Sequence, residues 1–153
     1  MVKKTSKDLP LLELTVRKYE KPYNISNREL VKKFCLGIGL LQPGDSRDVI
    51  VEILLVLLKS KKERKELRIE EVQGKVIELR KKSNLPLVGV AQSNIRRQIR
   101  RLREVHIAEK IKNSYRINEF DNIKNIFNEK IREFVLPPIL ARIEIYSEML
   151  DKI

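Results

Sequence analysis

Apolar residues recur at helical spacing through most of the chain, and this pattern predicts a mainly α-helical fold. The predicted helices are Leu9–Tyr19, Ser26 to about Cys35, Arg47–Ser60, Glu70–Lys82 and Ser93–Glu104. From Asn118 to Ile153 a further helix carries an apolar stripe, and Pro137-Pro138 should kink or restart it. Ser26 and Glu29 have the spacing of a capping box, which predicts the start of a helix that buries Leu30, Val31 and Phe34.

Short segments with alternating apolar residues interrupt the helices. Leu67–Ile69 is predicted as a very short strand, and Ile107–Ile111 with Tyr115–Ile117 as a β-hairpin. Asn113 tolerates a positive φ and is expected at the hairpin turn. Pro86 and Gly89 rule out a continuous helix before Ser93. The predicted fold class is therefore mainly α with a small β-hairpin.

The charge distribution singles out the middle of the chain. Of the net charge of +12, residues 59–116 contribute eighteen basic and seven acidic side chains, or +11. Residues 36–58 and 117–153 are each −2, and residues 1–35 are +5. A basic centre between slightly acidic helical flanks predicts a surface that binds a polyanion.

Five of these cations are arginines between Arg96 and Arg103, and residues 93–103 contain no acid. At 100° per residue, Ile95, Ile99 and Leu102 fall within about 60° of one another and should be buried. A merely solvated helix would instead alternate Glu with Lys. The opposite face carries Ser93, Asn94, Arg97, Arg100 and Arg101. The pattern therefore predicts contact with nucleic-acid bases through Asn94, Arg97, Arg100 and Arg101, and with phosphates through the flanking Arg96 and Arg103.

The segment "SNIRRQIRRLREVHIAEKIKNSYRI" (residues 93–117), with the helix–strand–helix order before it, resembles the winged helix-turn-helix regulators of archaea and bacteria. The resemblance implies a recognition helix at 93–104 that enters the major groove of double-stranded DNA. It also implies wing contacts from Lys110, Lys112, Asn113 and Arg116. The linker of roughly ten residues before the arginine helix is longer than the tight turn of many family members.

Three regions are expected. Residues 1–45 form an N-terminal helical extension, residues 46–117 the winged-helix domain, and residues 118–153 a helical region through which the chain forms a homodimer. The last expectation rests on an apolar stripe that a small domain cannot cover: Phe120, Ile123, Phe127, Ile131 and Phe134, continued by Ile139, Ile143, Tyr146, Leu150 and Ile153.

Other chemistry finds little support in the sequence. With one His (His106) and one Cys (Cys35), we expect no soft-ligand metal site, no cofactor and no catalysis. Asp45, Asp48 and Glu52 lie close together but are typical of capping and helix-face positions. No segment has the length and apolarity to span a bilayer, so a cytoplasmic protein without membrane contact is expected.

Sequence-specific binding of double-stranded DNA by a transcriptional regulator is thus the expected function. Two alternatives remain open. One is an RNA-associated or architectural protein with little sequence preference, and the other is a winged domain used only for protein–protein assembly. Affinity for duplex DNA against duplex RNA distinguishes the first alternative, because the deep, narrow major groove of A-form RNA excludes a helix.

Overall fold

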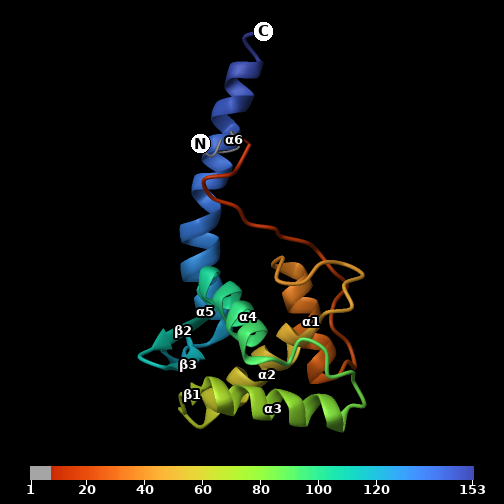
Figure 1. Ribbon diagram of the computed structural model, residues 1–153. Helices are drawn as coiled ribbons and strands as arrows, with labels where there is room; N and C mark the ends of the chain where they lie inside the picture. Colours follow the sequence, from red (N-terminus) through yellow and green to blue (C-terminus); the bar gives the residue numbers. More distant parts are fainter. Residues whose placement is uncertain (1–7) are drawn as a thin grey trace, which may run out of the picture.

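The computed structural model describes residues 8–153 and shows a mainly α-helical chain with one small antiparallel sheet (Figure 1). The helices of the body are α1 (Asn27–Gly37), α2 (Val49–Lys62), α3 (Ile69–Lys82) and α4 (Gln92–Glu104). The strands are β1 (Leu67–Arg68), β2 (Ala108–Ile111) and β3 (Ser114–Ile117). The predicted fold class is confirmed, and each predicted body helix after residue 26 is found within two or three residues of its expected ends.

The sheet has the order β1-β3-β2, so the early strand pairs with the far side of the hairpin. Leu67 faces Tyr115, and Lys110 faces Tyr115 from the other side. The hairpin turn places Lys112, rather than the expected Asn113, at positive φ (55°). The order α2, β1, α3, α4, β2, β3, with the hairpin directly after α4, is consistent with a winged helix-turn-helix arrangement.

Helix α2 is the centre of the core, because it is buried on nearly every side by α1, α3, α4 and β3. Its Ile53 and Leu57 are fully buried, as are Ile95, Ile99 and Leu102 of α4. The predicted burial of the isoleucine–leucine stripe is therefore confirmed. On α1, Val31 is buried and Phe34 packs against the core, but Leu30 is exposed, contrary to expectation.

No helix forms at Leu9–Tyr19, where the sequence pattern predicted one. Instead this segment crosses the body as an irregular arm (Figure 1). The backbone N–H of Arg17 donates to Gly37 O at 2.8 Å, and its guanidinium donates to Leu36 O and Leu41 O. These bonds satisfy the carbonyls of the last two residues of α1 and of Leu41 in the loop that follows. Since an isolated helix of this length is marginal, the tertiary bonds decide the conformation.

The C-terminal region begins with η1 (Asn118–Phe120) and continues as one long helical stretch, α5 (Ile123–Ile126), η2 (Phe127–Val135) and α6 (Leu136–Leu150). The segment η2 is a π-helix, and Leu136 N–H donates to Ile131 O, five residues back. Pro137 and Pro138 have no N–H, and the wider π-helical turn accommodates them without ending the helix. The kink or restart predicted at Pro137-Pro138 is therefore a local change from α-helical to π-helical winding.

Candidate nucleic-acid interface

Helix α4 lies on the near side of the molecule in Figure 1. The charged residues opposite its buried stripe are exposed to solvent. Its inner stripe of Ile95, Ile99 and Leu102 has zero exposure, so the rotation of the helix about its axis is set by the core. The residues exposed on α4 are Ser93, Arg96, Arg97, Arg100, Arg103 and Glu104. Within residues 8–153, none of the four exposed guanidinium groups forms an ion pair.

Asn94 and Arg101 do not lie on this open face, although the sequence placed them there. Asn94 Nδ2 donates to Gly89 O at 2.7 Å, and Gln98 Nε2 donates to Asn94 Oδ1 at 3.3 Å. Arg101 Nη1 donates to Gln98 Oε1 at 2.9 Å, and its Nη2 reaches Gly39 O at 3.5 Å. These bonds run along one flank of α4 and fasten it to the two loops beside it. Both side chains are half-buried as a result.

The loop before α4 is shaped to receive this flank. Gly89 has a φ of +77°, and a Cβ built there would lie 2.9 Å from Asn94 Nδ2. Gln73 of α3 donates to Val90 O at 3.0 Å and accepts from Gln92 Nε2 at 3.1 Å. The long linker that the sequence showed is therefore an ordered connection that fixes the start of α4.

The hairpin stands beside α4 as a wing with a basic tip. Lys110, Lys112 and Asn113 are exposed. Arg116 is not free in the same way, because its guanidinium lies 3.2 Å from Glu109 Oε2 and 3.6 Å from Glu66 Oε1. It also stacks at 4.6 Å over the ring of Phe120. Arg116 therefore braces the base of the wing.

A cleft joins the wing to the N-terminal half of α4 and contains a cation that the sequence analysis missed. It has a volume of about 320 Å³ and is lined by Arg68, Ile69, Glu70, Arg96, Lys110, Asn113 and Tyr115. Arg68 lies in this cleft because β1 pairs with β3, which places β1 next to the hairpin. The alternation in Leu67-Arg68-Ile69, with the apolar residues buried, was the available signal. One carboxylate, Glu70, accompanies three cations in this cleft.

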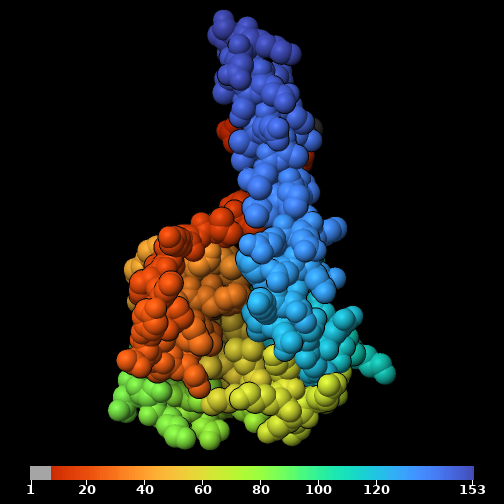
Figure 2. All heavy atoms as spheres, turned by 180° about the vertical axis from the view of Figure 1, so that it is seen from behind, coloured from red at the N-terminus to blue at the C-terminus, as the bar shows by residue number. Residues whose placement is uncertain are grey.

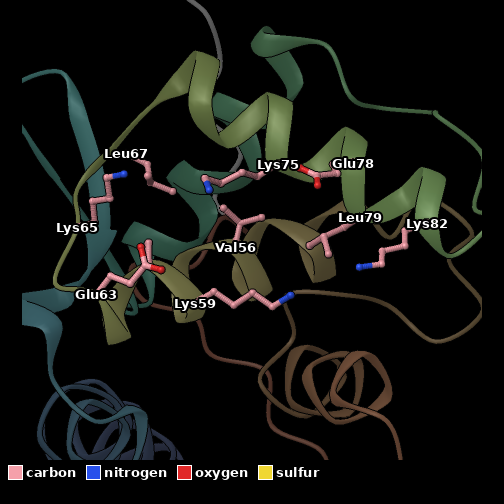
Figure 3. Close-up of a pocket in the computed structure, with 10 residues that line it drawn as sticks. Val56, Lys59, Glu63, Lys65, Leu67, Lys75, Glu78, Leu79 and Lys82 are labelled. Atoms are coloured by element: carbon pink, nitrogen blue, oxygen red, sulfur yellow. The ribbon is translucent and has the colours of Figure 1, made fainter.

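A second basic feature lies apart from this face. Lys59, Lys65, Lys75 and Lys82 surround a groove between α2 and α3, with Val56, Leu67 and Leu79 among its lining residues (Figure 3). Glu63 and Glu78 also line it, and no residue of α4 or the wing does. We therefore treat the α4–wing surface, which is the more strongly cationic of the two, as the candidate interface.

Comparison of the chain with protein-family models, with curated proteins and with solved structures finds no match. The likeness to the winged helix-turn-helix arrangement thus rests on the order of the elements and the sheet topology.

The side chains of the other candidate metal or catalytic residues are engaged in contacts within the protein. Asp48 and Glu52 are bound by Arg28 and Arg80, and residues 8–153 contain no group of three His, Cys, Asp or Glu placed to hold a metal. Burial raises the pKa of Cys35 to about 12, which keeps the thiol protonated at neutral pH. His106 packs edge-on against Phe134, with ring centroids 6.2 Å apart. None of the helices in the described part of the chain could cross a membrane.

Proposed function

We propose that the chain binds double-stranded DNA through α4 and the wing, as a cytoplasmic transcriptional regulator of the winged-helix type. The observation that carries this proposal is the set of four exposed arginines without ion pairs on a helix whose opposite face is fully buried. An α-helix of about 10–12 Å diameter fits the major groove of B-form DNA. Because no carboxylate of the described residues pairs with these four arginines, their charges are available to a bound polyanion.

We assign different roles to different parts of this surface. Arg97 and Arg100 lie opposite the buried stripe and are the residues we assign to base edges, where arginine binds guanine in a bidentate way. Arg96 faces the wing cleft with Arg68 and Lys110, a grouping suited to a phosphate. Ser93, Arg103, Lys112 and Asn113 are exposed around this centre and complete the contact surface.

One observation favours the alternative of a nucleic-acid binder with little sequence preference. Asn94 is hydrogen-bonded to Gly89 and Gln98, and Arg101 to Gln98 and Gly39. Two of the four side chains predicted to contact bases are thereby engaged within the protein. Fewer free donors on α4 shift the balance from base readout towards phosphate contact.

Selection of bound fragments from random duplex DNA, followed by affinity measurements in a salt series, tests the proposal. A DNA regulator enriches a defined sequence and binds it at least 10³-fold more tightly than scrambled duplex. An unselective binder enriches nothing and shows only the salt-dependent part of the affinity. Equal or tighter binding of duplex RNA would contradict major-groove entry by α4. No binding to either at low salt would leave the assembly function instead.

A further inference from the structure

Helix α6 buries none of its side chains although most of them are apolar. Figure 2 shows the helix standing clear of the body, with solvent around most of its length. Ile143 is 56% exposed, Tyr146 61% and Leu150 65%. A helix that is apolar around much of its circumference is normally buried against something, and monomers rarely leave a continuous apolar surface of this kind open.

The spacing of these side chains indicates what covers them. Successive members of one stripe lie three, four, three, four and three residues apart: Leu136, Ile139, Ile143, Tyr146, Leu150 and Ile153. This is the a/d repeat of a coiled coil, in which a second helix packs its side chains into the holes of the first. Leu140 and Met149 flank the stripe and widen it. The surface is therefore built for a helix and not for a small ligand.

We propose that α6 of a second copy of this chain covers this seam, defined as the six stripe residues from Leu136 to Ile153. The other long helices of the described chain, α1 to α4, turn their apolar stripes into their own core. The helix of this chain that offers an exposed a/d seam to a partner is therefore α6. Two-fold pairing of α6 with α6 of a second copy would bury both seams at once.

Residues 123–131 of the C-terminal stripe do not take part in this pairing. Ile126 and Ile131 are buried in the core of their own chain, and Ile123 and Phe127 pack against that core. The expected dimer region of residues 118–153 therefore narrows to residues 136–153. This limit coincides with the end of the π-helical segment η2 at Val135.

The N-terminal arm forms a second wall of the interface. A cleft of about 540 Å³ lies between Leu9–Leu12 and the seam residues Ile139, Ile143 and Tyr146. Leu11 is 96% exposed, and Leu9 and Leu12 are 65% and 46% exposed. A partner helix lying on the seam would pack against these leucines too, so the arm and α6 together clasp the second copy.

This inference does not rest on DNA binding, and its test is made without DNA. Sedimentation of the full chain at micromolar concentration should give twice the mass of 18.0 kDa. Ile143→Asp puts a charge in the seam and should give the single-chain mass. Ile145→Asp is the matched control, because Ile145 is 49% exposed on the same helix about 160° away from Ile143 and should leave the dimer intact.

Because Ile143 contacts no core residue in the single chain, Ile143→Asp should keep the helical circular-dichroism signal of the body. A monomeric wild type, or a dimer that Ile143→Asp leaves unchanged, would overturn the proposal. So would an assembly larger than two chains.

Disulfide trapping supplies an independent readout. In a parallel pair Leu150→Cys meets its own copy, whereas in an antiparallel pair Ile139→Cys meets Leu150→Cys of the other chain. The native Cys35 is fully buried and does not compete. Either cross-link, with none from Ile145→Cys, supports the seam. Absence of both cross-links would overturn it.

Discussion

The guanidinium of Arg80 on α3 hydrogen-bonds to the carboxylate of Glu52 on α2 in the interior of the protein, where each side chain is 2% exposed. Arg80 also contacts Asp48 at 3.2 Å and donates from Nε to Pro86 O at 2.8 Å. Arg28 of α1 closes the network from the other side, at 2.8 Å from Glu52 and 2.7 Å from Asp48. Two cations and two anions thus tie three helices to the linker that leads into α4.

Arg80→Ala should destabilise the fold strongly. It leaves the buried carboxylate of Glu52 with Arg28 alone and frees the carbonyl of Pro86. Removing one partner of a buried ion pair costs about 3–5 kcal/mol in the free energy of unfolding. Urea denaturation measures this loss, with Lys81→Ala, an exposed neighbour on α3, as the control. A change of less than about 1 kcal/mol, the scale of an exposed pair, would show that the network is not holding the helices together.

The same network predicts how stability depends on pH. Burial works to raise the pKa of Asp48, but hydrogen bonds and charges from Arg28 and Arg80 outweigh it and lower the pKa below its usual value. A carboxyl group with a lower pKa in the folded chain stabilises the protein above its unfolded pKa, near 3.9. That contribution disappears as the pH falls through the folded pKa.

The free energy of unfolding of the wild type should therefore drop as the pH falls below about 4, and Asp48→Asn should flatten this drop. Asp48→Asn should also lower stability at pH 7, since it removes a charge partner of Arg28 and Arg80. Asp151→Asn, at the exposed end of α6, is the control. Identical pH profiles for wild type and Asp48→Asn would contradict the role assigned to this carboxylate.

The sequence was sufficient to predict α4, the hairpin and β1, because each carries a strong local pattern of apolar spacing. The arm at Leu9–Tyr19 and the flank of α4 were not predictable in this way. The arm has helical spacing, but Arg17 bonds to carbonyls at the C-terminal end of α1. On the flank of α4, Asn94 bonds to Gly89 in the preceding loop, and Arg101 bonds to Gly39, which is distant in sequence. Such tertiary hydrogen bonds leave no periodic signal. The alternation in Leu67-Arg68-Ile69 indicates that Arg68 faces outward, but it takes the pairing of β1 with β3 to place Arg68 at the cleft of the candidate interface.

Two glycines should respond oppositely to substitution by alanine. Gly89→Ala forces a Cβ to 2.9 Å from Asn94 Nδ2 at a φ of +77°, so it should destabilise the chain by about 1–3 kcal/mol. Gly74→Ala, within α3 and with open space around it, should stabilise by about 0.5–1 kcal/mol. Thermal unfolding compares them directly. Because Gly89 also positions the start of α4, Gly89→Ala should weaken DNA binding even at temperatures where the chain is folded, whereas Gly74→Ala should not.

Arginine-to-alanine variants of α4 should separate base contacts from phosphate contacts. Arg97 and Arg100 are exposed opposite the buried stripe, so their loss should leave folding intact. Each should cost about 1–3 kcal/mol on the preferred duplex and relax selectivity at one base pair. Arg96→Ala and Lys112→Ala should instead weaken binding on every sequence and lower the salt slope by about one each. Binding to preferred and scrambled duplexes across a salt series distinguishes the two classes.

Arg101→Ala provides the sharpest contrast, because the sequence and the structure assign this residue different roles. As a base contact it would change selectivity, but its guanidinium is bound to Gln98 and Gly39. We expect a modest loss of stability and a uniform loss of affinity, without a change of preferred sequence. Arg132→Ala on η2 and Lys75→Ala in the α2–α3 groove control for removal of one exposed cation. If Arg97→Ala and Arg100→Ala matched these two controls on every duplex, α4 would not be a recognition helix, and its arginines would form only a solvated face.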